Sequence, residues 1–148
     1  PVLWVDDMQI TSDSINILMK NQKIEKMFFY PNPLIASEAD SLFYNQIMGK
    51  YMTAFFSENK LRKIDVKGNG QSLFLIENDN KDNIGLNKAI CTDISINMKE
   101  SKLSDITYKV VPTSTTIPIQ DIIESDKFLE QFIWRMDEKP LSKEDIME

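Results

Sequence analysis

The sequence of 148 residues predicts an all-β fold in which three β-hairpins stack side by side. One segment recurs three times without internal gaps, at offsets of 37 and 42 residues, and apolar and polar residues alternate within each copy. Alternation with a period of two places side chains on opposite faces of a β-strand. Each copy also divides into two such runs around a polar tetrapeptide, which is the arrangement of a hairpin.

The first strand of each copy presents three apolar residues to one face. They are Ile15, Ile17 and Met19, then Met52, Ala54 and Phe56, then Ile94, Ile96 and Met98. Polar tetrapeptides follow at 20–23, 57–60 and 99–102, and none contains the Asn-Gly pair that marks the tightest turns. The second strands resume at Ile24, Leu61 and Leu103. Shorter strands are expected between the hairpins, at 33–37, 42–46, 71–76 and 84–88.

The character of the chain changes after Pro112, so we predict a hairpin-repeat domain over 1–112 and a C-terminal segment over 113–148. Residues 113–116 are polar and are expected to form a loop. The apolar spacing over 121–136 favours one or two short amphipathic helical turns, with Ser125 or Asp126 as N-cap. This short helical cap is expected to cover one end of the stack, because an open sheet edge otherwise pairs with another chain.

Composition excludes several classes of function. The net charge of -6 argues against a protein that binds nucleic acid through its phosphates. The absence of histidine removes histidine general bases and histidine metal ligands, and a single cysteine allows neither an internal disulfide nor a cysteine metal cluster. The carboxylates show neither a paired acid and base nor a calcium-loop spacing. We therefore expect no catalytic residues, no metal site, no cofactor and no enzymatic activity.

The candidate binding site is the ribbon of apolar side chains that the stacked hairpins would share. Its members are Ile15, Ile17, Met19, Met27, Met52, Phe56, Ile64, Val66, Ile94, Ile96, Met98 and Ile106. Such a ribbon usually packs on itself as a closed core. An open sandwich would instead accept an apolar guest, and the eight methionines favour an adaptable surface. Both interpretations stay open at this point.

Two further features recur at fixed positions of the repeat. Lys23, Lys60 and Lys102 occupy one position, so stacked turns would bring them together as a basic row. This row suits either solvated hairpin turns or contacts with the phosphates of a lipid head group. Cys91 falls at the position of Ser12 and Gly49, which predicts a small residue in a tight slot and not a reactive thiol.

Two segments of the chain combine residues in patterns that are more specific than repeated hairpins. The first runs from Gln46 to Gln71 and ends in the Gly-Asn-Gly-Gln sequence at 68–71. The second runs from Phe132 to Ile146 and combines Trp-Arg at 134–135 with Pro140 and the Ser-Lys-Glu-Asp-Ile run at 142–146. With these motifs the chain resembles, over nearly its whole length, the OstA-like, LptA-related lipopolysaccharide-transport proteins, particularly the Bacteroidetes type. Lys139 stands where an arginine is common in that family.

The resemblance implies an open, V-shaped β-jellyroll that resides in the periplasm and works toward the outer membrane. It further implies that the apolar groove holds lipopolysaccharide acyl chains, and that copies join end to end, or to other transport proteins, by strand pairing. The residues alone leave a second possibility, a closed β-scaffold or adhesion module without a lipid ligand. The chain begins at Pro1 without Met or a signal segment, so we expect it to be part of a longer protein.

Overall fold

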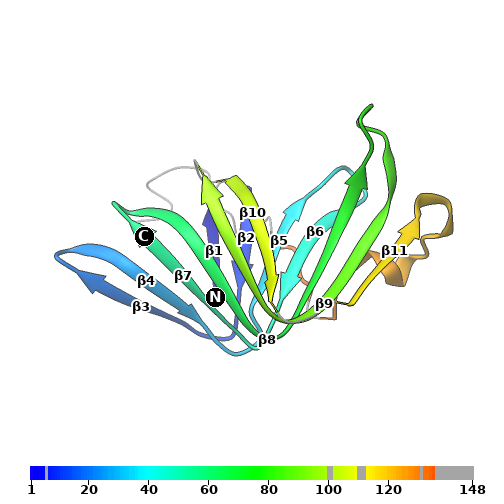
Figure 1. The fold of residues 1–148 in the computed structure, drawn as a ribbon. Helices are drawn as coiled ribbons and strands as arrows, with labels where there is room; N and C mark the ends of the chain where they lie inside the picture. The colour runs from blue at the N-terminus through cyan, green and yellow to red at the C-terminus, as the bar shows by residue number, and fades with distance from the viewer. Residues whose placement is uncertain (6, 100–101, 110–112, 131, 136–148) are drawn as a thin grey trace.

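The computed structural model describes residues 1–5, 7–99, 102–109, 113–130 and 132–135. These residues form an 11-stranded antiparallel sheet that curls into two arms meeting at a vertex (Figure 1). The predicted all-β, open jellyroll-like fold is confirmed. Among the described residues, no helix has the length and apolar character needed to cross a membrane.

The three predicted hairpins make up one arm, which we call the hairpin arm. It pairs β3 (Ile15–Lys20) with β4 (Lys23–Phe29), β7 (Tyr51–Ser57) with the first half of β8 (Lys60–Glu77), and the second half of β9 (Asn83–Lys99) with β10 (Lys102–Lys109). Pairing of β4 with β7 and of β8 with β9 joins the hairpins side by side. The stack that the repeat predicted is therefore one continuous half of the sheet.

The second arm, which we call the covered arm, contains the strands that connect the hairpins. It is built from β1 (Val2–Val5), β2 (Met8–Thr11), β5 (Leu34–Glu38), β6 (Tyr44–Met48), the remaining halves of β8 and β9, and β11 (Thr113–Pro118). The long strands β8 and β9 run through both arms and bend at the vertex. In β8 the bend falls at Gly68 and Asn69, whose φ angles of 81° and 49° lie in the left-handed region.

Each hairpin carries a β-bulge at the same position of the sequence repeat. The strand register skips one residue of the second strand in each case: Glu25, Arg62 and Ser104. These residues are separated by the same offsets of 37 and 42 that relate the sequence copies. A bulge leaves one residue without an opposite partner and increases the local twist. The repeat therefore specifies the shape of each hairpin as well as its pattern of apolar residues.

The hairpin turns are of the two-residue kind despite the missing Asn-Gly pair. Asn21 and Gln22 in the first turn, and Glu58 and Asn59 in the second, all have positive φ angles. Two positive φ angles define the type I′ turn, whose twist matches that of the strands. Asparagine at one of the two positions lowers the cost of this conformation. Residues 100 and 101 of the third turn lie outside the described residues.

Small residues fill a slot at the vertex, as the repeat predicted. Ser12, Gly49 and Cys91 are all buried where the chain crosses from one arm to the other. The Ser12 hydroxyl donates a hydrogen bond to the Ser14 carbonyl (2.6 Å), and the Cys91 thiol donates one to the Asp93 carbonyl (3.1 Å). The equivalent position in two copies thus makes the same bond to a carbonyl two residues on.

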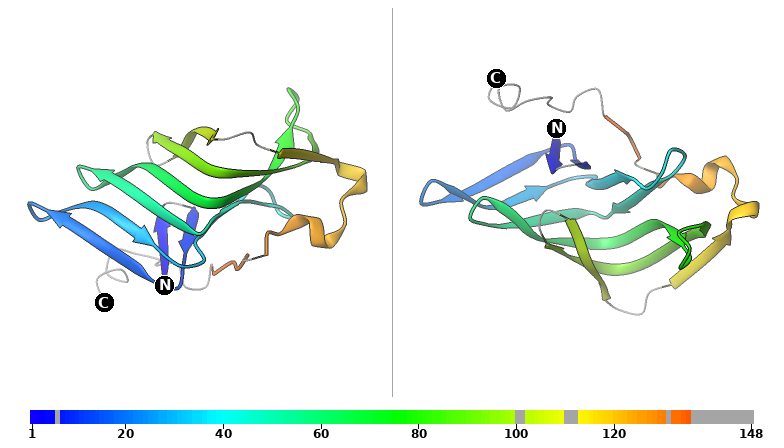
Figure 2. Two further views of the ribbon diagram at one scale, coloured as in Figure 1. Left: turned by 60° about the horizontal axis from the view of Figure 1, so that its bottom comes forward. Right: turned by 90° about the horizontal axis from the view of Figure 1, so that it is seen from above.

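The chain after Pro112 differs from the prediction in three ways. The expected loop at 113–116 is part of β11, because its β-branched threonines suit an exposed edge strand and pair with β9. The expected amphipathic turns are two short 3-10 segments, η1 (Ile119–Asp121) and η2 (Glu124–Lys127). The N-cap of η2 is Ile123, and not Ser125 or Asp126. The segment that follows covers the outer face of the covered arm instead of one end of the stack (Figure 2).

Two buried glutamines hold this C-terminal segment by its backbone. The Gln46 amide donates to the Lys127 carbonyl (2.7 Å) and accepts from the Leu129 amide (2.7 Å). The Gln9 amide does the same with the Ile133 carbonyl (2.6 Å) and the Arg135 amide (2.7 Å). Each side chain therefore pairs with the extended segment as the backbone of a neighbouring strand would.

Apolar contacts complete the attachment of the C-terminal segment. Leu129 is buried in a second core cluster with Leu34, Ala36, Phe43, Met48, Leu73 and Leu86 of the covered arm. Aromatic rings extend this cluster, since Trp134 lies within 5.3 Å of Trp4 and 4.9 Å of Tyr44, measured between ring centroids. Much of the outer face of the covered arm is consequently protein interior.

We predict that Gly49→Ala destabilises the fold by about 2 kcal/mol, because an added Cβ would lie 2.5 Å from Cγ1 of the buried, β-branched Val66. Gly70→Ala is the comparison and is expected to cost less, since its Cβ would meet Cγ1 and Cδ1 of Ile94 at the longer distances of 3.0 and 3.1 Å. Urea denaturation measures both free energies of unfolding. Equal losses for the two variants would contradict the tight slot at position 49.

We predict that Gln46→Glu lowers the free energy of unfolding by about 1–3 kcal/mol, because the carboxylate cannot donate to the Lys127 carbonyl and is buried without that partner. Gln22→Glu, in an exposed hairpin turn, serves as the control and is expected to be neutral. Denaturation curves give the stability, and near-ultraviolet circular dichroism reports the packing of Trp134. An unchanged spectrum and stability for Gln46→Glu would refute the role of Gln46 in holding the C-terminal segment.

Candidate functional site

The candidate site is the apolar interior between the two arms. Its buried members come from both arms and form one contiguous cluster. The hairpin arm supplies Met27, Phe29, Met52, Ala54, Leu61, Ile64, Val66, Ile94, Ile96 and Met98, the covered arm supplies Met8, Ile10, Ile35 and Ile47, and Cys91 lies at the vertex. Alternation along each strand sends these residues inward and their polar neighbours outward.

The structure brings ten of the twelve predicted ribbon residues into this interior. Seven are buried: Met27, Met52, Ile64, Val66, Ile94, Ile96 and Met98. Three are half-buried and pack against the cluster: Ile15, Phe56 and Ile106. The alternating pattern therefore identified the inward face of the hairpin arm correctly.

Ile17 and Met19 lie on the same inward face but outside the packed interior. Ile17 is opposite Met27, and Met19 is opposite Ile24, across the first hairpin. Their side chains are nevertheless 54% and 57% exposed. The hairpin extends beyond the part of the interior that the opposite arm covers, so its apolar face continues into solvent at β3.

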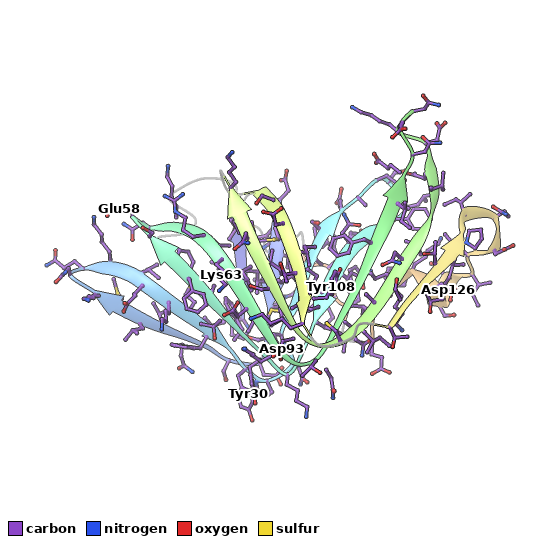
Figure 3. The ribbon with its side chains drawn as sticks, in the orientation of Figure 1. Tyr30, Glu58, Lys63, Asp93, Tyr108 and Asp126 are labelled. Atoms are coloured by element: carbon purple, nitrogen blue, oxygen red, sulfur yellow. The ribbon has the colours of Figure 1, made fainter. Side chains whose placement is uncertain are left out.

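The margin of the interior is half-exposed and largely apolar. Leu3, Val5, Ile24 and Phe74 pack against the buried cluster without being enclosed by it. Tyr108 on β10 belongs to the same margin and reaches from one arm to the other, where its hydroxyl shares a hydrogen bond with the buried Ser72 (2.9 Å). Figure 3 shows Tyr108 near the vertex. This bond ties the third hairpin to the covered arm.

Sequence reasoning missed the contribution of the covered arm to the interior. Ile10, Ile35 and Ile47 are buried there, and Phe29 joins them from the end of β4. A signal was present at residues 34–36, where three consecutive apolar residues are typical of a strand buried on both faces. Ile35 indeed faces the interior, while Leu34 and Ala36 face the C-terminal segment.

The predicted basic row is interrupted by an acidic residue. Lys23 lies at the tip of the first hairpin and forms an ion pair with Glu58 at the tip of the second (2.6 Å). The Ile24 amide also donates to the Asn59 side chain (3.2 Å), so the two tips are joined. Lys60 is exposed beside them. The side chain of Lys102, the third member of the row, lies outside the described residues.

The remaining candidate for chemistry, Cys91, is a buried thiol. Burial raises its pKa, the Asp93 carboxylate adds to the increase, and hydrogen bonds with the backbone of Lys109 and Asp93 oppose it. A raised pKa keeps the thiol protonated and unreactive. Within the described part of the chain, no group of three or more Cys, Asp or Glu side chains is placed to hold a metal ion.

Comparisons with known proteins returned no match: no family model, no curated protein and no solved structure corresponds to this chain.

We predict that Ile96→Ala destabilises the protein by about 2–4 kcal/mol, whereas Ile17→Ala changes its stability by less than about 0.5 kcal/mol. Both side chains point inward from the hairpin arm, but Ile96 is 1% exposed and Ile17 is 54% exposed. Guanidinium denaturation of the two variants makes the comparison. A similar loss for both would mean that the first hairpin also packs into a closed interior.

Proposed function

We propose that the protein is a non-catalytic periplasmic carrier that holds the acyl chains of lipopolysaccharide, or of a related lipid, between its two arms during transport to the outer membrane. The observation that carries the proposal is the inward apolar face of the hairpin arm. This face runs from the buried cluster, through a half-buried margin, to the exposed Ile17 and Met19 on β3. An apolar surface that continues from core to solvent supports entry of an apolar ligand at that end.

The energetics of acyl chains suit such a surface. Each methylene moved from water into an apolar environment is worth about 0.8 kcal/mol, so a few chains suffice for tight binding. The interior is lined by methionines as well as branched residues, and thioether side chains adapt to ligands of irregular shape. The acidic net charge of the chain does not oppose this binding, because the acyl chains carry no charge.

The resemblance to lipopolysaccharide-transport proteins supports the location and the partners in this proposal. Among the described residues, β1 and β3 at one end of the sheet, and β10 and β11 at the other, each pair on one side only. Open edges of this kind accept a strand from another chain. End-to-end assembly of copies, or pairing with other transport proteins, is the arrangement we propose.

A closed β-scaffold or adhesion module is the second candidate, and one observation favours it. The buried cluster between the arms is at most 9% exposed at any residue. A scaffold needs only this packed core, whereas a carrier must admit the acyl chains at the margin or by separation of the arms. The two candidates therefore differ in whether lipid reaches the inward face.

Photo-crosslinking from two adjacent residues separates the candidates. Phe56 belongs to the margin of the interior, while Phe55 lies on the outer face beneath the ammonium groups of Lys26 and Lys63. Both side chains are half-buried, so p-benzoyl-phenylalanine at either position is comparably accessible. With purified lipopolysaccharide at high salt, which releases lipid held by charge on the outer face, we expect several-fold more crosslinked lipid from position 56 than from position 55.

The matched control is the same experiment without lipopolysaccharide and with phosphatidylcholine vesicles in its place. Equal crosslinking from positions 55 and 56, or none from position 56, would contradict the carrier and leave the scaffold. Crosslinking to phosphatidylcholine alone would show an acyl-chain site that does not require lipopolysaccharide.

A further inference from the structure

We propose that the outer face of the first two hairpins is a docking surface for an anionic lipid membrane. The apolar part of this surface, which we call the outer patch, consists of Leu18, Phe28, Tyr30 and Tyr51. This inference concerns the face opposite the interior, so it stands whether or not the interior holds lipid.

Strand register places the outer patch on one face. Phe28 lies between Met27 and Phe29, which point inward, and pairs with Thr53 of β7. Leu18 is opposite Lys26, which lies two residues from Phe28 along β4 and therefore on the same face, closer to the hairpin tip. Tyr51 precedes the inward Met52, and its ring lies 5.8 Å from that of Tyr30. Figure 3 shows Tyr30 on the outer side of the vertex, directed away from the interior.

Exposure of apolar residues is concentrated on these hairpins. Of the 12 large apolar or aromatic residues that are exposed in the described part of the chain, six belong to β3, β4, β7 or the residue after β4. They are the four residues of the outer patch together with Ile17 and Met19. On the corresponding face of the covered arm, the C-terminal segment helps to bury Leu34, Ala36 and Leu86, whereas Ile90 stays exposed. A concentration of exposed apolar residues of this kind marks an interaction surface.

Charge indicates what this surface meets. The chain has 17 Lys or Arg and 23 Asp or Glu, and residues 15–30 and 50–67 contain eight of these cations but only three of the anions. This part therefore carries a charge of +5, and the other 114 residues carry -11. A basic surface that also exposes aliphatic and aromatic side chains has the two features required for binding to anionic lipids.

The cations surround the outer patch. Lys26 and Lys63 lie over the Phe55 ring on the same face, with ammonium groups 5.2 and 5.6 Å from its centroid. Lys20 and Lys60 are exposed at the hairpin tips, and Lys67, which forms an ion pair with Asp93 (3.6 Å), is exposed near the vertex. A second copy is a less suitable partner for this face, because two copies meeting through it would bring like charges together.

Co-sedimentation with sucrose-loaded vesicles tests the docking surface. We expect the protein to bind vesicles of phosphatidylcholine mixed with phosphatidylglycerol, to bind phosphatidylcholine vesicles weakly, and to be released by high salt. The double variant Lys20→Glu/Lys60→Glu should lose at least about tenfold in affinity, because each lysine near an anionic surface contributes roughly fivefold. Lys81→Glu/Lys88→Glu, at exposed positions of the covered arm, is the control with the same change in net charge.

A second pair of variants tests the apolar contribution. Leu18→Ser/Tyr51→Ser removes side chains that are 44% and 48% exposed, and we expect a severalfold loss of vesicle binding. Ile90→Ser/Ile84→Ser removes side chains that are 45% and 47% exposed on β9 and should bind as the unaltered protein does. Because all four positions are exposed, thermal melting should be nearly unchanged in both variants.

Three results would overturn the proposal: no binding to the anionic vesicles at low salt, equal losses for the test and control variants, or a concentration-dependent dimer that only Leu18→Ser/Tyr51→Ser abolishes. The last result, measured by light scattering without vesicles, would assign the face to a second copy. None of these outcomes affects crosslinking from position 56, so failure of the docking surface is distinguishable from failure of the carrier function.

Discussion

The structure depends on the bend that β8 and β9 share at the vertex. These two strands pair with each other on both sides of the bend, through Lys63–Lys67 against 93–97 and again through Gly70–Glu77 against 83–91. The register of this pair shifts between Lys67 and Gly70, and such an irregularity sharpens the bend of a strand pair. Every other strand adds to one half or the other, so the angle between the arms follows from this one bend.

The bend leaves two apolar interiors, an inner one between the arms and an outer one on the outer face of the covered arm, and different parts of the chain close them. The inner one is closed by the opposite arm, except at the first hairpin, where no strand lies beyond β3 among the described residues. The outer one is closed in large part by the C-terminal segment, whose backbone is hydrogen-bonded to Gln9 and Gln46. Buried backbone groups must be paired, so these two glutamines do for the segment what another strand would do. The covered arm is thereby buried on its outer face at β2, β5 and β6, while the hairpin arm leaves its outer face open to solvent.

The openness of the hairpin arm connects the two proposals. Its inward face offers apolar side chains to a lipid, and its outward face combines the outer patch with a local positive charge inside an acidic protein. A carrier must meet a membrane at some stage of transport, and the proposed docking surface lies on the same two hairpins whose inward face is exposed at Ile17 and Met19. The acidic remainder of the chain would repel an anionic membrane and so orient these hairpins toward it.

The sequence by itself determined the three hairpins, the inward set of apolar residues and the small residue at Ser12, Gly49 and Cys91, because these depend on local alternation and on a repeat that can be aligned. It did not determine that β8 and β9 run through both arms, that β2, β5 and β6 contribute Ile10, Ile35 and Ile47 to the interior, or that 113–118 form an edge strand. The attachment of the C-terminal segment could not be predicted from the sequence either, since Gln9 contacts residues more than 120 positions away. Such pairings are decided by which surfaces meet once the sheet has curled, and a pattern within one strand carries no information about its distant partner.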